Sequence, residues 1–378
     1  MSKAQANLFS TLQAEAPSPK ERFARLQLIR SHGIGMTGFH RLLAEYGSAR
    51  DILARLPDDR PGFTPCPSER IHKELKAGKQ CKAELILWGD PTYPPALKDI
   101  PDPPVALWMK GKTDLLQRPG VALVGARNAS SIGLRMAKRL GADLGGEGMV
   151  VISGLARGTD AAAHEGALSH GTIAVVAGGV DVIYPPDNKD LQSAISATGL
   201  LISEHPPGTH PTARHFPMRN RIISGLSQGV VVIEAALKSG SMITAKNALD
   251  QGREVMAVPG HPIDTRAGGC NALIRDGATL IRGADDVLLA LPPITSTSAT
   301  PTKETQPQPR SRPPRKPPAD ITALHREILD RMSSAPQHES DLMDELNVTL
   351  PDLDLLLTRL ELDGQLERKS GGILRLLR

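Results

Sequence analysis

The feature that most constrains the fold is a series of glycine-containing segments, several of which follow apolar, β-branched runs and lead towards helices. In chain order they read V-A-L-V-G-A-R (121–127), S-G-L-A-R-G-T-D (153–160), A-G-G-V-D (177–181), S-G-S-M-I-T-A (239–245) and V-P-G-H-P (258–262). Strands that alternate with helices are typical of an α/β fold with a doubly wound, mostly parallel sheet. Because the carboxyl ends of parallel strands share one edge, we expect these glycines and arginines on a rim suited to phosphates.

Hydrophobic periodicity supports this Rossmann-like assignment. Ile132, Met136, Leu140 and Leu144 recur at every fourth position, as on one face of a helix. The pattern predicts further helices over 161–168, 244–249 and 284–291. It predicts strands over 121–124, 150–152, 172–176, 230–233, 254–258 and 280–281.

The composition excludes several classes of protein. The three cysteines, Cys66, Cys81 and Cys270, are too far apart for a zinc motif or a disulfide framework. The first residues lack a signal-peptide core, and no run approaches the ~20 apolar residues that span a bilayer. We therefore expect a cytoplasmic protein with no membrane partner. The net charge of +4 is only a mild basic bias.

The sequence predicts five regions. Residues 1–20 are expected to be a disordered tail, and 21–82 a small helical domain. In that domain the run G-I-G at 33–35 resembles the turn of a helix-hairpin-helix. Residues 84–291 form the Rossmann-like unit, 292–318 a proline-rich linker, and 319–378 a winged helix with a strand pair at 366–369 and 373–376.

Several of the glycine-containing segments carry candidate phosphate contacts. Gly125 allows a ligand to approach the backbone, and Arg127 offers a guanidinium fork to a phosphate. Arg157 projects from a helix start, and the pair Gly178–Gly179 follows a strand. Ser239, Gly240 and Ser241 precede a helix and are a further candidate cradle of N–H groups.

The segment H-P-P-G-T-H-P-T-A-R-H-F-P-M-R-N-R (205–221) is the sharpest chemical signal, and we expect its end, H-F-P-M-R-N-R (215–221), to be a basic loop. No acidic residue occurs between Glu204 and Glu234, an interval that holds Arg214, Arg219, Arg221 and three histidines. Phe216 beside Asn220 and these arginines suits a platform on which single-stranded bases stack. The residues alone leave a second reading open, in which the Phe anchors the core and the arginines make structural hydrogen bonds.

The motifs of common nucleotide enzymes are absent from the sequence. There is no Walker A motif, and V-G-A-R-N-A-S-S-I-G is not the G-x-G-x-x-G of dinucleotide folds. No Ser/His/Asp set and no metal-ligand set has a definable role. We therefore expect a binding protein with no cofactor, rather than an enzyme.

Assembled in order, these strings resemble the DNA-processing protein A family (DprA/Smf) over residues 85–290. The resemblance is carried by V-G-A-R, S-G-L-A-R-G-T-D-A-A-A-H-E-G-A-L, G-G-V-D-V-I-Y-P-P, F-P-M-R-N-R-I-I-S-G-L-S and E-A-A-L-K-S-G-S-M-I-T-A. It implies a homodimer that binds and protects single-stranded DNA without sequence specificity. It also implies that this DNA is delivered to the RecA recombinase in natural transformation.

The resemblance also assigns residues. Arg127 matches the phosphate arginine after the first strand, and Phe216 the base-contacting aromatic. Several members carry a lysine three residues before that Phe, where this chain has Ala213, with Arg214 adjacent. The alternatives are a phosphoribohydrolase-like enzyme or a nucleotide sensor. The enzyme motif P-G-G-x-G-T-x-x-E is replaced here by S-G-S-M-I-T-A-K, which lacks its Glu.

The charge of the C-terminal module argues against DNA binding there. Residues 319–363 contain eleven acidic and three basic side chains, a net charge of −8. Such helices repel phosphates, so we expect this module to contact protein.

Overall fold

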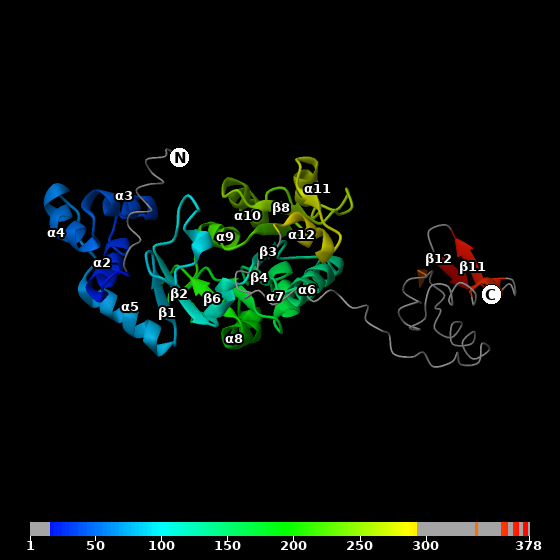
Figure 1. The fold of residues 1–378 in the computed structure, drawn as a ribbon, viewed down its shortest axis with the longest axis horizontal. Helices are drawn as coiled ribbons and strands as arrows, with labels where there is room; N and C mark the ends of the chain where they lie inside the picture. Colours follow the sequence, from blue (N-terminus) through cyan, green and yellow to red (C-terminus); the bar gives the residue numbers. More distant parts are fainter. Residues whose placement is uncertain (1–15, 293–336, 339–356, 362–365, 370–372, 377–378) are drawn as a thin grey trace, which may run out of the picture. The chain divides into compact units, whose positions relative to one another are not determined.

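A nine-stranded sheet organises the larger part of the chain and confirms the predicted fold class (Figure 1). The computed structural model describes residues 16–292, 337–338, 357–361, 366–369 and 373–376, and the chain divides into units Met1–Thr297 and Ser298–Arg378. The strands of the sheet are β1 (Glu84–Leu87), β2 (Ala106–Gly111), β3 (Gly120–Val124), β4 (Val150–Ser153), β5 (Thr172–Val175), β6 (Leu200–Ser203), β7 (Gly229–Val232), β8 (Glu254–Ala257) and β9 (Thr279–Leu280).

The strand order is β1-β2-β6-β5-β4-β3-β7-β8-β9. Every pairing from β6 to β9 is parallel, and the pairings of β1 with β2 and of β2 with β6 are antiparallel. The chain moves outward from β3 to β6 on one side and from β7 to β9 on the other. The loops after β3 and β7 therefore diverge at a topological switch point, where such sheets usually bind ligands.

Helices cover both faces of the sheet. Val121 and Leu123 of β3 pack with α6, α7 and α12, whereas Ala122 and Val124 belong to the opposite core with α9 and α10. This period-two alternation buries both faces, as expected of a parallel sheet. The helices are α6 (Ser131–Gly146), α7 (Thr159–Ala167), α8 (Lys189–Thr198), α9 (His215–Gly225), α10 (Gly240–Asp250), α11 (Gly268–Arg275) and α12 (Ala284–Ala290), with short 3₁₀ helices η1 (Pro95–Leu97), η2 (Thr113–Gln117) and η3 (Pro186–Asn188).

The segment predicted to be a basic loop is the first half of helix α9, so that prediction is wrong. Pro217 is compatible with a helix because it lies in the first turn, where backbone N–H groups have no intrahelical partner. The helix places residues three and four apart on one side, so its arginines do not share one environment.

In the described part of the chain four helices precede the sheet: α2 (Pro19–Ile29), α3 (Met36–Tyr46), α4 (Ala49–Asp59) and α5 (Ser68–Gln80). The first begins at Pro19, inside the stretch expected to be a tail, because Ser18 caps it by accepting a hydrogen bond from the Glu21 N–H at 3.3 Å. Between α2 and α3, Gly33 adopts φ of +79°, which glycine tolerates, so the tight turn expected at G-I-G is confirmed.

These helices pack against the antiparallel edge of the sheet. Trp108 of β2 donates its indole N–H to Glu74 of α5 at 3.0 Å, and Arg30 of α2 pairs with the same carboxylate at 2.9 Å. A Cβ at Gly78 would lie 2.0 Å from the Trp108 ring, so only glycine lets α5 approach this closely. The helical domain is therefore fixed to the sheet by buried, paired groups.

The second unit contains the strand pair expected from the sequence. Strands β11 (Leu366–Lys369) and β12 (Ile373–Leu376) pair antiparallel, and β10 (Gln337–His338) flanks β12. Residues 357–361 are helical, and Leu357, Leu360, Leu366 and Leu374 are buried. The predicted linker beyond Pro292, the first two helices of the winged helix and the start of its third lie outside the described residues.

Candidate nucleic-acid interface

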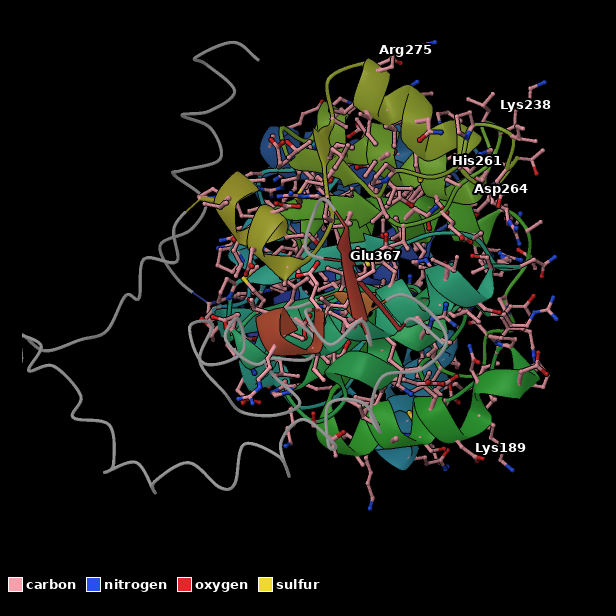
Figure 2. The ribbon with its side chains drawn as sticks, turned by 90° about the vertical axis from the view of Figure 1, so that its right-hand side faces the viewer. Lys189, Lys238, His261, Asp264, Arg275 and Glu367 are labelled. Carbon is pink, nitrogen blue, oxygen red and sulfur yellow. The ribbon has the colours of Figure 1, made fainter. Side chains whose placement is uncertain are left out.

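A pocket of about 240 Å³ lies at the carboxyl edge of the sheet, above β4 and β5. We call it the rim pocket. Arg127 enters it from the loop after β3, Arg157 from the loop after β4, Gly178 and Tyr184 from the loop after β5, and Phe216 from the first turn of α9. Figure 2 shows how far this edge extends, because Lys189 after β5 and Lys238 and His261 after β7 and β8 project from the same side.

The rim pocket combines two aromatic rings with two arginines. The Arg127 guanidinium carbon lies 5.1 Å from the Phe216 ring centroid, and the Tyr184 and Phe216 centroids are 5.7 Å apart at 52°. Among the described residues Arg127 forms no ion pair, and Arg157 meets only Asp187 at 3.7 Å, with both side chains exposed. Both cations are therefore available to an anionic ligand.

Arg219, one turn after Phe216, is buried and does not line the rim pocket. It donates hydrogen bonds to the backbone carbonyls of Gly154 and Val175, at the carboxyl ends of β4 and β5. A Cβ at Gly154 would lie 2.5 Å from this guanidinium, so glycine makes room for it. Burial lowers the pKa of Arg219 to about 10, and the nearby Asp160 opposes that shift. Arg219 thus fixes α9, and with it Phe216, to the strands that line the rim pocket.

Asn220 and Arg221 are also buried. Arg221 pairs with Glu204 at 2.6 Å and with Asp102 at 3.2 Å, and Asn220 donates to the Gly240 carbonyl at 3.3 Å. Burial raises the pKa of the Glu204 carboxyl, and the charge of Arg221 opposes the rise. Of the predicted contacts in this segment, the structure leaves Phe216 half-buried in the pocket wall and Arg214 exposed just before α9.

The glycine pair after β5 faces protein. The Gly179 N–H donates to the Thr209 carbonyl at 2.8 Å, and a Cβ at Gly178 would lie 2.7 Å from that oxygen. Glycine is needed here because the segment before α9 passes directly over the strand end. Gly178 and Gly179 thus shape the rim pocket indirectly, because they leave space for the segment that contains Thr209.

The predicted cradle at 239–241 lies beside the end of β3 and outside the rim pocket. Ser241 is buried and donates its hydroxyl to the Gly125 carbonyl at 2.8 Å. Gly125 itself has no room for a side chain, because a Cβ would lie 2.6 Å from the Thr159 hydroxyl. Ser239 and Gly240 open α10, and neither lines the pocket.

The usual phosphate position of such a sheet is occupied by the protein itself. At the switch point, the Glu234 carboxylate after β7 accepts the Ser130 N–H at 2.8 Å and also the Ser130 hydroxyl. A Cβ at Gly133, in the first turn of α6, would lie 2.5 Å from this carboxylate. The negative group thus sits at the positive end of α6, where a nucleotide phosphate would otherwise bind.

Two residues near the pocket, Asp160 and His164, have structural roles. Asp160 accepts the N–H groups of Gly154 and Ala156 at 3.1 and 3.4 Å, which holds the loop after β4 in place. Buried His164 contacts the Thr172 hydroxyl at 2.8 Å. Over the described ranges no group of His, Cys, Asp or Glu side chains is arranged to hold a metal ion, and no helix could span a membrane.

Tyr184 was not among the site residues expected from the sequence. Its aromatic character and its place in G-G-V-D-V-I-Y-P-P, nine residues after the end of β5, are the signals that could have found it. Tyr184 is 42% exposed, so it presents a free surface beside Phe216.

The fold and the rim pocket define a Rossmann-like protein whose candidate ligand site is aromatic and basic. The chain belongs to the family described as DNA recombination-mediator protein A, whose model matches residues 84–292. Models of a DprA-like N-terminal HHH domain and a DprA winged helix domain match residues 19–77 and 312–372.

Individual relatives agree with this assignment. The chain is 47% identical over 201 residues to DNA processing protein DprA of Streptococcus pneumoniae, covering 53% of this chain and 71% of that protein. It is 46% identical over 226 residues to DprA of Bacillus subtilis, covering 59% and 76%. Protein Smf of Escherichia coli is 40% identical over 229 residues, covering 60% and 61%.

Two solved structures are similar in fold. The X-ray structure of S. pneumoniae DprA aligns with a TM-score of 0.58 at 33% identity, covering 77% of this chain and 99% of that one. A structure of DprA from Helicobacter pylori, which concerns the single-stranded DNA binding mode of that protein, aligns with a TM-score of 0.51 at 31% identity. It covers 55% of this chain and 94% of the other.

Proposed function

We propose that the protein binds single-stranded DNA at the rim pocket, without sequence specificity. The observation that carries the proposal is the contact of an unpaired cation, Arg127, with an aromatic face, Phe216. A single strand offers a phosphate and an unpaired base within one nucleotide, and the pocket offers one group suited to each. Tyr184 widens the stacking surface.

Binding would exchange one contact for another. A base that stacks on Phe216 takes the place of the Arg127 guanidinium, which then turns to the neighbouring phosphate. Arg157 and Arg214, both exposed, add charge at the edges of the pocket. Stacking contributes roughly 1–3 kcal/mol per base and favours none of the four, which is why we propose sequence-independent binding.

The larger role follows from the family. We propose that the protein acts as a homodimer that protects the strand and delivers it to the RecA recombinase during transformation, without catalysing a reaction. In support, DNA recombination-mediator protein A is the description of the matching family. The described residues also bring no nucleophile together with a general base at the rim pocket.

The occupied switch point argues against the two alternatives, a nucleotide sensor and a phosphoribohydrolase-like enzyme. The Glu234 carboxylate lies where the phosphate of a mononucleotide would bind and repels it. We therefore expect oligonucleotides to bind and mononucleotides to compete poorly.

A competition titration tests the proposal. A labelled oligothymidylate is bound to the protein, and unlabelled single strand, duplex, ATP and AMP are added in turn. We expect single strand to compete best, duplex less well, and both nucleotides hardly at all. Affinity should fall steeply with salt because phosphate contacts release counterions. Equal competition by duplex, or displacement by AMP, would contradict the proposal.

A further inference from the structure

A second hollow of about 460 Å³ lies beside the rim pocket, between the exposed sides of α6 and α7. We call it the α6–α7 groove. It begins at Arg127 and Asn128, continues along α6 past Arg135 and Lys138, and is bounded on the α7 side by Gly158 and Glu165. Arg127 lines both hollows, so one side chain joins the rim pocket to the groove.

The packing of the two helices determines where this groove runs. A Cβ at Gly166 would lie 2.0 Å from the Lys138 carbonyl, and one at Gly141 would lie 2.4 Å from the Ala163 carbonyl. These glycines let α6 and α7 approach backbone to backbone along their buried sides. The exposed sides then line a hollow that extends to the loop that carries Arg127.

The charge of the groove is mainly positive. Its bases are Arg127, Arg135 and Lys138, and its acid is Glu165. In the described part of the chain Arg135 has no ion-pair partner, and Lys138 meets Glu165 at 3.3 Å with both side chains more than half exposed. Solvent weakens so exposed a pair, which leaves Lys138 able to exchange Glu165 for a phosphate.

The spacing of the bases suits a polymer. Arg135 and Lys138 are three residues apart, so they lie on one face of α6 about 4.5 Å apart along its axis. A ligand of one nucleotide in the rim pocket would not extend to them. Only a chain that continues past Arg127 brings further phosphates into the groove.

We infer that the single strand leaves the rim pocket over Arg127 and continues along the α6–α7 groove, with Arg135 and Lys138 binding its phosphates. The inference rests on the proposed function and adds the path that the strand takes beyond the rim pocket. Glu165 limits the affinity of this extension, because its carboxylate competes for Lys138 and repels the phosphates.

The test compares two lengths of oligothymidylate, about 4 and about 16 nucleotides, which span the usual site sizes of single-strand binders. The Arg135→Ala/Lys138→Ala protein should bind the longer strand roughly two- to thirtyfold more weakly, if each contact contributes like an exposed ion pair. Its salt slope should fall by about 1.4, or 0.7 per lost phosphate contact. The shorter strand should bind as it does to the unaltered protein.

Two further variants make the test specific. Arg139→Ala is the matched control, because Arg139 lies on the same helix, pairs with Asp143 at 3.4 Å and does not line the groove. It should bind both strands normally. Glu165→Gln should bind the longer strand more tightly, and this gain cannot arise from damage to the fold.

The outcomes separate the path from the proposed function. Normal binding of the longer strand by the double variant overturns the path, even if the unaltered protein binds both strands. The path is also overturned if the double variant loses the same affinity for both lengths, or if Arg139→Ala loses as much affinity as the double variant. The loss would then reflect the lower positive charge of the whole protein and not a contact in the groove. Failure of the unaltered protein to bind either strand overturns the proposed function and the path together.

Discussion

The Arg127 guanidinium lies over the ring of Phe216, with 5.1 Å between the guanidinium carbon and the ring centroid. Residues from the end of β3 and the start of α9 thus meet at the mouth of one pocket. Without DNA the contact holds the arginine by a cation–π interaction, which contributes about 0.5–1 kcal/mol at an exposed site. The same two groups are those we assign to phosphate and base.

Arg127→Ala should weaken single-strand binding and flatten its salt dependence. One lost phosphate contact lowers the slope of log K against log salt by about 0.7. Titrations of an oligothymidylate at several salt concentrations measure both effects. A slope identical to that of the unaltered protein would refute the phosphate role of Arg127.

Phe216→Ala should weaken binding by roughly 1–3 kcal/mol and leave the salt slope unchanged, because a stacking contact is lost and no ion is involved. Phe216→Tyr is the matched control and should retain most of the affinity, since it keeps the ring. If Phe216→Ala instead lowered the salt slope, the lost affinity would come from a weakened phosphate contact of Arg127 and not from lost stacking.

Two arginines of the same segment should behave in opposite ways. Arg221→Ala leaves the buried Glu204 carboxylate without its partner and should lower the free energy of unfolding by about 3–5 kcal/mol. Arg214→Ala, at an exposed position, should change the free energy of unfolding by less than about 0.5 kcal/mol and weaken DNA binding instead.

Denaturant unfolding and oligonucleotide titration on both variants measure this contrast. Adding Glu204→Gln to the Arg221→Ala protein should recover part of the lost stability, because it removes the unpaired charge. Equal stability of the two single variants would contradict the structural role of Arg221.

The alternation of strand and helix was predictable from β3, β4, β5, β7, β8 and β9, which coincide with the short apolar runs expected to be strands. The strands β1, β2 and β6 were not predicted, and β2 contains no β-branched residue. The first turn of α9 was not predicted either, because His215-Phe216-Pro217 contains a proline that usually marks a loop. Only the surrounding packing shows that Pro217 lies at a helix start. Once the segment is helical, Arg219 and Arg221 must lie on its buried sides, where carbonyl and carboxylate groups accept their hydrogen bonds.

Part of the candidate site was predictable because its residues follow strand ends closely: Arg127, Arg157 and Gly178 do so, and the structure brings them to the rim pocket. Phe216 was predictable for another reason, since it is an aromatic residue in a basic interval without acids. Tyr184 lies farther along its loop, and its distance from the strand end hides it in the sequence. Glu234 was overlooked for a different reason, since its partner Ser130 is 104 residues away and no local pattern connects them.

Acid should destabilise the fold through two histidines, the buried His164 and the half-buried His205. Burial lowers the pKa of His164 to about 3, and burial together with the charge of His215 lowers that of His205 to about 4. Both stay neutral in the fold but take up protons near pH 6.5 when the chain unfolds. The contribution of the two histidines to the free energy of unfolding is therefore complete above pH 6.5. It decreases as the pH falls below that value, by about 1.4 kcal/mol per pH unit for each histidine.

Unfolding titrations between about pH 7 and pH 5 measure this slope. The carboxyls of Asp160 and Glu204, whose pKa values burial raises, oppose the trend and are present in every variant. His164→Gln cannot titrate, so its stability should depend on pH with a slope smaller by about one proton. An unchanged slope would mean that His164 is protonated in the fold.

Removal of the C-terminal module should have little effect on DNA binding. Residues 319–363 carry a net charge of −8, so they repel phosphates. A protein truncated after Leu291 should bind a single strand within a few-fold of the full chain. A tenfold loss, about 1.4 kcal/mol, in a truncated protein that remains folded and dimeric would overturn this prediction.

The carboxylate of Glu234 at the start of α6 has a consequence for the protein in a cell. Free nucleotides far outnumber exposed single strands there, and a vacant helix start at the switch point would be filled by them for most of the time. With that position closed from within, a molecule that carries only one or two phosphates gains little from the remaining surface. A long strand gains from many weak contacts at once, so we expect the protein to bind few free nucleotides and still to retain DNA.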